Sequence, residues 1–195
     1  RSMRIPSMVL IRLMPSAPAS SQAFAIETIS VTLGESLMIT GFVVTALTAL
    51  VTSAAAVAMC RAIEKIDGEN PSIKWVNDIF CEDRKVCGIL TEASLDLESG
   101  GLHYAVLGIG INIFPPKEGF PEELPDIAGC ISAAQTEDLN SRIAAEVIDR
   151  FFSEYPRISE KGFLEEYRKR SILTDKKVNV KGAAYLDMVL CNQKG

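Results

Sequence analysis

The chain has 195 residues, 48% of them hydrophobic and 23% charged, with 20 Lys and Arg against 25 Asp and Glu. This length and balance predict one folded domain with its own core and exclude a wholly disordered chain. The net charge of −5 argues against a nucleic-acid partner, which would select a basic face that neutralises phosphates. A single histidine and five cysteines without two-residue spacing argue against structural zinc and disulfide frameworks. The reduced cytoplasm is therefore the expected compartment.

The stretch from Ser36 to Cys60 carries no charge and is long enough to cross a bilayer. A transmembrane helix is one interpretation. We favour the other, a buried helix of a soluble protein without a membrane partner, because the stretch holds several Ser and Thr and lacks flanking basic clusters and aromatic belts. Apolar residues at helical spacing predict a helix over 45–66, and Asp67-Gly68 predicts its end.

The order of the remaining elements is mixed. Residues 1–44 show no sustained period and stay unassigned. The expected strands and turns, in chain order, are strands at 73–75 and 79–81, a turn at 82–84, a strand over 85–97, a turn at 98–101 and a strand over 102–114. Helices are expected over 137–155 and 159–170, followed by a strand at 176–181 that opens a small β-domain. The class is therefore α+β, with a mixed β-sheet and helices packed on it.

Three segments hold candidate site residues. The run Lys74-Trp75-Val76-Asn77-Asp78 places a cation, an aromatic and two short polar side chains at a strand end, although a solvated turn uses the same residue types. Lys85 opens a strand whose alternate side chains are Lys85, Cys87, Ile89 and Thr91. An anion-binding lysine and an ordinary edge-strand lysine are both open interpretations.

The third segment, Gly108-Ile109-Gly110-Ile111-Asn112, interrupts a strand with two glycines and adds an amide. Glycine in a strand often marks a place where a ligand lies against the backbone. Together with the run at 74–78 and Arg84-Lys85-Val86-Cys87-Gly88-Ile89-Leu90-Thr91-Glu92, this segment resembles the catalytic core of biotin protein ligases. The preceding Ala-rich helix and Tyr167-Arg168-Lys169-Arg170-Ser171 are similar to that family as well, so the resemblance spans about 46–180.

The resemblance implies a biotin/lipoate ligase-like catalytic fold over 45–170 and the start of an incomplete SH3-like β-domain over 171–195. It implies a ligase that uses ATP, biotin and Mg²⁺, forms biotinyl-5'-AMP and transfers biotin to a lysine. That lysine belongs to the biotin carboxyl carrier domain of a carboxylase, the expected partner, and a homodimer is a compatible assembly.

The resemblance also implies the roles of particular residues. Lys85 and Asp78 are the expected catalytic residues, Lys85 and Gly88 bind biotin, and Asp78 lies near Mg²⁺. The expected nucleotide-binding residues come from the two flanking segments and are Lys74, Asn77, Gly108, Gly110 and Asn112.

The chain also departs from the family. It has no loop of Gly-Arg-Gly-Arg type and no upstream Ser/Thr-Thr-Asn segment, and Val76 stands where proline is usual. We therefore expect a fragmentary, aberrantly spliced or frame-shifted reading of a ligase gene, with impaired activity, rather than an intact ligase with a rewritten ligand loop. A lipoate-type acyl ligase and a non-catalytic fragment or interaction module are the alternatives, and the paired segments at 75–78 and 108–112 favour biotin.

Overall fold

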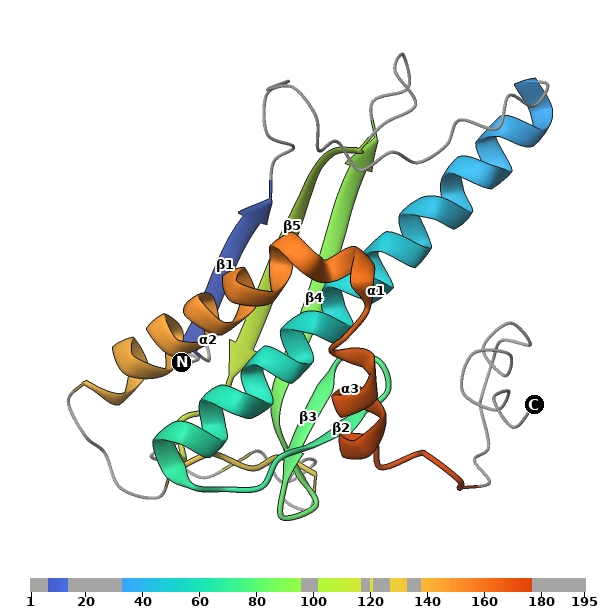
Figure 1. Ribbon diagram of the computed structural model, residues 1–195. Helices are drawn as coiled ribbons and strands as arrows, with labels where there is room; N and C mark the ends of the chain where they lie inside the picture. Colours follow the sequence, from blue (N-terminus) through green and yellow to red (C-terminus); the bar gives the residue numbers. More distant parts are fainter. Residues whose placement is uncertain are drawn as a thin grey trace.

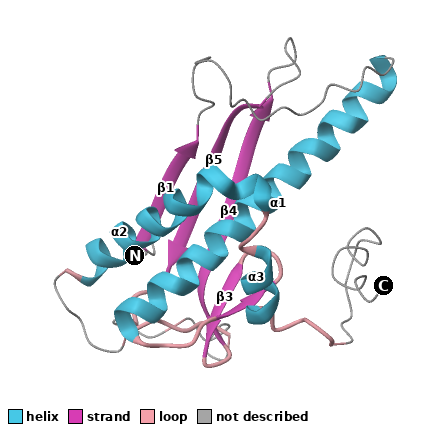
Figure 2. Ribbon diagram, in the orientation of Figure 1, coloured by secondary structure: helices cyan, strands magenta, loops and turns pink. Residues whose placement is uncertain are grey.

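The computed structural model describes residues 7–13, 33–95, 102–116, 120, 127–132 and 138–176, with side chains described over 46–94, 104–116, 120, 127–132 and 138–176. The described part is one β-sheet with helices packed on one of its faces (Figures 1 and 2). In chain order the elements are β1 (Ser7–Leu13), α1 (Leu33–Asp67), β2 (Ser72–Lys74), β3 (Asp78–Cys81), β4 (Arg84–Leu95), β5 (Leu102–Ile111), α2 (Leu139–Glu154), the 3-10 helix η1 (Tyr155–Glu160) and α3 (Leu164–Arg170).

The sheet has five strands in the order β1-β5-β4-β3-β2. All four pairings between these strands are antiparallel, so the expectation of a mixed sheet is wrong for the described strands. Strands β2 to β5 follow one another through short connections, and such connections join antiparallel neighbours, whereas parallel neighbours need long crossovers. Parallel contacts occur as two isolated bridges, Ile73 to Ser171 and Lys85 to Ala128.

Helix α1 begins at Leu33, earlier than the expected helix over 45–66, and ends at Asp67. Its end agrees with the sequence, because Gly68 adopts a φ of 77° and donates its N–H to the carbonyl of Glu64 at 3.1 Å. The part Ala46–Asp67 is long and apolar enough to cross a membrane, yet 67% of its most apolar window is buried inside the protein. This burial supports the interpretation as a core helix.

The two faces of the sheet differ in what covers them. Cys87 and Ile89 of β4, each 2% exposed, face the helices, and the Thr91 hydroxyl meets the Thr52 hydroxyl of α1 at 2.6 Å. Leu90, between Ile89 and Thr91, is 62% exposed. Because successive strand residues point to opposite faces, the helices cover one face and leave the other open among the described residues.

The C-terminal helices differ from the sequence expectation at one point. Helix α2 matches the expected helix over 137–155 closely. The second expected helix, 159–170, is wrong at its start, because η1 runs to Glu160 and Lys161 then adopts a left-handed φ of 59° before α3 begins. Nearly all of the expected strand at 176–181 and of the SH3-like start over 171–195 lies outside the described residues.

Candidate functional site

Four of the predicted site residues lie in one row across the open face of the sheet. Lys74 of β2 is paired with Asp78 of β3, Asp78 with Gly88 of β4, and Gly88 with Gly110 of β5. Residues directly opposite each other in antiparallel strands project from the same face. The row therefore gathers a cation, a carboxylate and two positions without side chains on one surface.

Lys85 joins this row because of a break in the strand register. Ile79 pairs with Cys87 but Phe80 pairs with Lys85, so β4 holds one extra residue. Strict alternation, which the sequence predicts, would place Lys85 on the helix-covered face with Cys87. The bulge turns it to the opposite face, over Gly88. The expected alternation is thus wrong at Lys85.

The Lys85 ammonium pairs with the carboxylate of Asp78. Nζ lies 2.6 Å from Oδ1, and the two side chains are 39% and 25% exposed. A Cβ atom at Gly88 would lie 3.5 Å from both Cε and Nζ of Lys85 and 3.8 Å from Oδ1 of Asp78. The missing side chain at position 88 therefore leaves the ion pair accessible from the open face.

The turn before β3 is held to its neighbours at two points. Asn77 forms two bonds with Ile89: its carbonyl accepts from the Ile89 N–H and its Nδ2 donates to the Ile89 carbonyl, both at 2.9 Å. The Tyr167 hydroxyl donates to the Val76 carbonyl at 3.3 Å. Trp75 is partly buried against the core, and its peptide bond to Val76 is cis. The side-chain nitrogen of Asn77 thus holds the turn to β4, and its Oδ1 is the side-chain atom that could accept a hydrogen bond from a ligand.

The remaining predicted residues lie at the borders of the row. Lys74 is exposed, and its ammonium lies 5.7 Å from the ring centroid of Phe80. Gly108 is paired with the exposed Leu90. Asn112 follows β5 and donates its N–H to the Val86 carbonyl at 2.8 Å, next to Lys85. All three segments singled out in the sequence therefore meet at one end of the open face.

A magnesium ion would find one carboxylate here. Among the residues whose side chains are described, no group of three or more His, Cys, Asp or Glu could hold a metal by itself. Mg²⁺ usually takes one or two carboxylates and completes its shell with water and phosphate oxygens. Lys85 pairs with Oδ1 of Asp78, so Oδ2 would be the oxygen available to such an ion.

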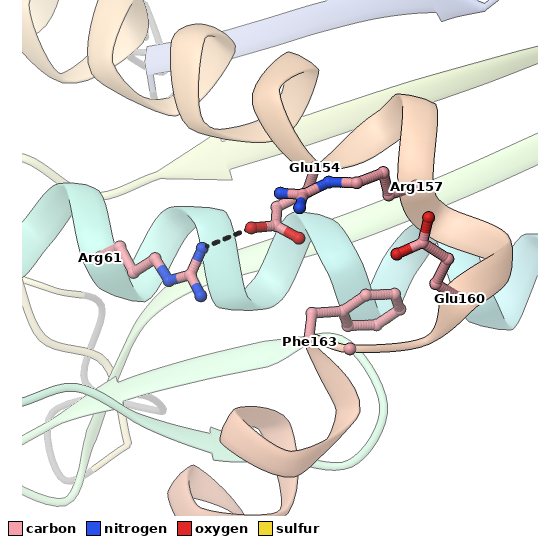
Figure 3. A pocket seen from close by; sticks show the side chains of 6 residues that line it. Arg61, Glu154, Arg157, Glu160 and Phe163 are labelled. Carbon is pink, nitrogen blue, oxygen red and sulfur yellow. Dashed lines mark hydrogen bonds and ion pairs between the residues drawn. The ribbon is translucent and has the colours of Figure 1, made fainter.

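Two cavities lie away from this surface. One of about 240 Å³ is lined by Arg61, Glu154, Arg157, Glu160, Gly162 and Phe163, and its Arg61 pairs with Glu154 at 3.1 Å (Figure 3). A wider one of about 890 Å³ lies by the β3–β4 turn, lined in part by Cys81, Arg84 and Cys130. Neither includes Lys85 or Asp78, so we place the site by its chemistry, on the open face of the sheet.

Comparison with known sequences supports a ligase class for this surface. Residues 26–112 match the Biotin/lipoate A/B protein ligase family. The match begins inside the segment 1–44 that the sequence leaves unassigned, and it ends at Asn112, the last residue of the predicted site. All predicted site residues lie within it.

Two curated relatives bear the same name in different organisms. The chain is 41% identical over 86 residues to the bifunctional ligase/repressor BirA of Bacillus subtilis (strain 168). This alignment covers 44% of this chain and 26% of that protein. It is 35% identical over 57 residues to BirA of Escherichia coli (strain K12), and this alignment covers 29% of this chain and 17% of that protein. The chain thus spans about a quarter or less of these relatives, and the matched segment is similar to the catalytic core of biotin protein ligases.

Solved structures share the fold. The biotin protein ligase of Aquifex aeolicus has a TM-score of 0.54 at 22% identity, covering 65% of this chain and 55% of that chain. The same enzyme in complex with biotin and ATP has a TM-score of 0.53 at 20% identity, covering 69% and 56%. The expected biotin ligase-like fold, a sheet with helices on it, is therefore confirmed.

Proposed function

We propose that this chain carries out ATP-dependent biotin ligation, forming biotinyl-5'-AMP and transferring biotin to a lysine of a carboxylase's biotin carboxyl carrier domain. The observation that carries the proposal is the Lys85–Asp78 ion pair, which lies over Gly88 on an open sheet face. The family match over residues 26–112 and the named relatives support the same reaction class.

The first step brings two anions together. A carboxylate oxygen of biotin attacks the α-phosphorus of ATP, the bond to the β-phosphate oxygen breaks, and pyrophosphate leaves. Lys85 would offset the repulsion between the carboxylate and the phosphate, as a fixed cation does where negative charge develops. Asp78 orients the ammonium at 2.6 Å, and Gly88 and Gly110 let the ligand approach the sheet backbone.

The second step needs a neutral lysine amine from the carrier domain. Its nitrogen attacks the acyl carbon of biotinyl-5'-AMP, AMP leaves, and the amine loses a proton as the amide forms. Lys74, Asn77, Gly108, Gly110 and Asn112 would contact the nucleotide from the two segments that border the Lys85–Asp78 pair. Mg²⁺, when bound through Asp78 and phosphate oxygens, would supply additional positive charge.

The missing Gly/Arg-rich loop bears on the activity. A loop of that type would retain the adenylate, so we propose for this sequence, which lacks the Gly-Arg-Gly-Arg motif, an activity below that of a ligase that has the loop. The cytoplasm as compartment, the carrier domain as partner and a homodimer as assembly are parts of the same proposal.

A lipoate-type acyl ligase is the second candidate, because the matched family covers both biotin and lipoate enzymes. Exchange of labelled pyrophosphate into ATP separates the two and needs no acceptor protein. We expect exchange that depends on biotin, is lost in Lys85→Ala, and is not supported by lipoate. Exchange with lipoate alone would favour the second candidate. Absence of exchange with both acids, together with no binding of biotinyl-adenylate, would contradict both and leave a non-catalytic module.

A further inference from the structure

The turn over 75–77 connects the edge strand β2 to Asp78, and α3 lies against it (Figure 1). We propose that Tyr167 of α3 is a positioning residue, whose hydroxyl fixes this turn and thereby the geometry of the Lys85–Asp78 pair. This inference rests on the proposed function and adds to it a residue 91 positions along the chain from Val76.

The hydroxyl of Tyr167 is a buried donor with a defined acceptor. The residue is 4% exposed, and its Oη donates to the Val76 carbonyl at 3.3 Å. Burial raises the pKa of Tyr167, so the hydroxyl stays protonated and keeps its donor hydrogen. Ser53 of α1 acts on the pKa of this hydroxyl in the opposite direction, and burial outweighs it. The tyrosine therefore spans the space between the core helix and the turn.

The residues at the end of α3 and just after it contact β2 and the residue that precedes this strand. The N–H of Ile172 donates to the Ile73 carbonyl at 2.9 Å, and Arg170 Nη1 donates to the Pro71 carbonyl at 3.4 Å. Arg170 is itself fixed by Glu64 at 2.7 Å. These contacts anchor the strand before the turn. Among the described contacts of α3, the bond from Tyr167 is the one that reaches the turn itself.

Val76, which accepts this bond, lies only two positions along the sequence from Asp78 of the ion pair. After Val76 comes Asn77, which forms two bonds with Ile89 of β4, and then Asp78, which meets Lys85. Both faces of the turn are thus held, by α3 on one side and β4 on the other. Without the Tyr167 hydroxyl the Val76 carbonyl loses its described partner, so the turn gains freedom to move Asp78 relative to Lys85.

Tyr167→Phe removes this hydroxyl and keeps the ring. Tyr155→Phe is the matched control, because Tyr155 is a partly buried tyrosine that stacks near Phe151 at 5.7 Å and has no described bond to the turn. In Tyr167→Phe we expect faster hydrogen exchange at the Ile89 amide than in wild type, while the amides of β5 change less. We also expect the affinity for a non-hydrolysable biotinyl-adenylate analogue, measured by titration calorimetry, to fall about 2- to 12-fold, the effect of one net hydrogen bond. Tyr155→Phe should change neither.

The outcomes separate this inference from the proposed function. Unchanged Ile89 exchange in Tyr167→Phe, or faster exchange there with unchanged affinity, overturns the positioning role. An equal change at the Ile89 and β5 amides also overturns it, because the effect is then one of global stability. If the wild-type chain does not bind the analogue, the proposed function fails, and Ile89 exchange alone decides whether Tyr167 holds the turn.

Discussion

The side chain of Lys85 lies across Gly88, where a Cβ would meet its Cε and Nζ at 3.5 Å. This is an ordinary van der Waals contact, so the position is open to a small side chain as far as the fold is concerned. It is also the place where a ligand carboxylate would reach the ammonium. The fold therefore tolerates a side chain at position 88, whereas binding of a ligand at Lys85 would require glycine there.

Gly88→Ala should therefore affect binding more than stability. We expect the melting temperature to stay the same or rise, since alanine is favoured over glycine within a strand by roughly 0.5–1 kcal/mol. The added methyl group would occupy the open face beside Lys85 and weaken binding of the adenylate analogue. Thermal melts and titrations of the same preparations check this. A large loss of stability without loss of affinity would contradict it.

Of the two lysines in the site, Lys85 should affect adenylation more than Lys74 when it is replaced by alanine. Removing one preorganised charge contact typically costs about 100- to 1000-fold in rate. We expect pyrophosphate exchange to fall below detection and affinity for the analogue to weaken by roughly 1.5–3 kcal/mol.

Lys74→Ala is the comparison, because Lys74 is exposed and lies near Phe80 rather than Asp78. Its loss should be smaller in both assays. Equal affinity of wild type and Lys85→Ala, with binding measurable in both, would show that Lys85 does not meet the ligand.

Gly129→Ala tests how the segment around residue 129 joins the sheet. Gly129 donates its N–H to the Lys85 carbonyl at 2.9 Å, and a Cβ there would lie 2.7 Å from Cβ of Arg84 and 3.4 Å from Cγ1 of Val86. An atom next to the backbone cannot move aside cheaply, so we expect a loss of about 1–3 kcal/mol in the free energy of unfolding. Gly162→Ala, with no atom within 4 Å of its Cβ, should be close to neutral in urea melts. Equal stabilities of the two variants would contradict this packing.

Glu166 couples acid stability to the contact between α1 and α3. Burial alone would raise its pKa, but hydrogen bonds from Arg61 at 2.6 Å and Arg170 at 2.7 Å outweigh burial and hold the pKa below its ordinary value of 4.5. A lowered pKa in the folded state means that the contribution to stability is complete above pH 4.5 and is lost as the pH falls through the folded-state pKa.

Glu166→Gln should thus lower the free energy of unfolding at neutral pH by roughly 1–2 kcal/mol. The loss is no larger because the ion pairs are partly exposed to solvent. Its stability should also fall less steeply than that of wild type below pH 4.5. Glu165 on the same helix also has a pKa lowered by its pair with Lys169, but such an exposed pair contributes little, so Glu165→Gln should change the profile less than Glu166→Gln. Identical acid profiles of wild type and Glu166→Gln would refute the assignment.

The cysteines should differ in reactivity according to burial. Burial raises the pKa of Cys60 and Cys81 to about 12 and raises that of Cys87 as well, so little thiolate forms at neutral pH. Cys130 is less buried. In a Cys191→Ser background, iodoacetamide at about pH 8 should label Cys130 first in the native protein, and all four after unfolding. Peptide mass mapping measures the order, and early labelling of Cys87 would contradict the described core.

The sequence was sufficient for those parts of the fold where local patterns decide the structure. The end of α1 at Asp67, before Gly68, and the turn at Glu82 and Asp83 follow from short-range chemistry. The position of β1 in the sheet depends on its pairing with β5, a segment far along the chain, which periodicity within one segment does not encode. The broken start of α3 depends on the left-handed conformation of Lys161, a residue without a strong preference for it.

The candidate site divides in the same way. Residue type and resemblance selected Asp78, Lys85 and Gly88 before any geometry was known. The alternation of Lys85 with Cys87, Ile89 and Thr91 is wrong at Lys85, because the bulge opposite Ile79 and Phe80 is set by pairing with β3. In the sequence Tyr167 stands only within the family-like segment 167–171, and its contact with Val76 requires the tertiary structure.

The pairing of β1 with β5 has a consequence for folding kinetics. Ser7 lies opposite Ile111, about a hundred residues later, whereas β3, β4 and β5 pair with their sequence neighbours. Closing so long a loop costs more entropy than forming a hairpin, so β1 should acquire its partner later than the hairpin strands do. Pulse-labelling during refolding should then show the amides of β4 protected before those of β1. Until β1 arrives, β5 is an unprotected edge of the nascent sheet, and a slow-folding chain would be most prone to self-association along that strand.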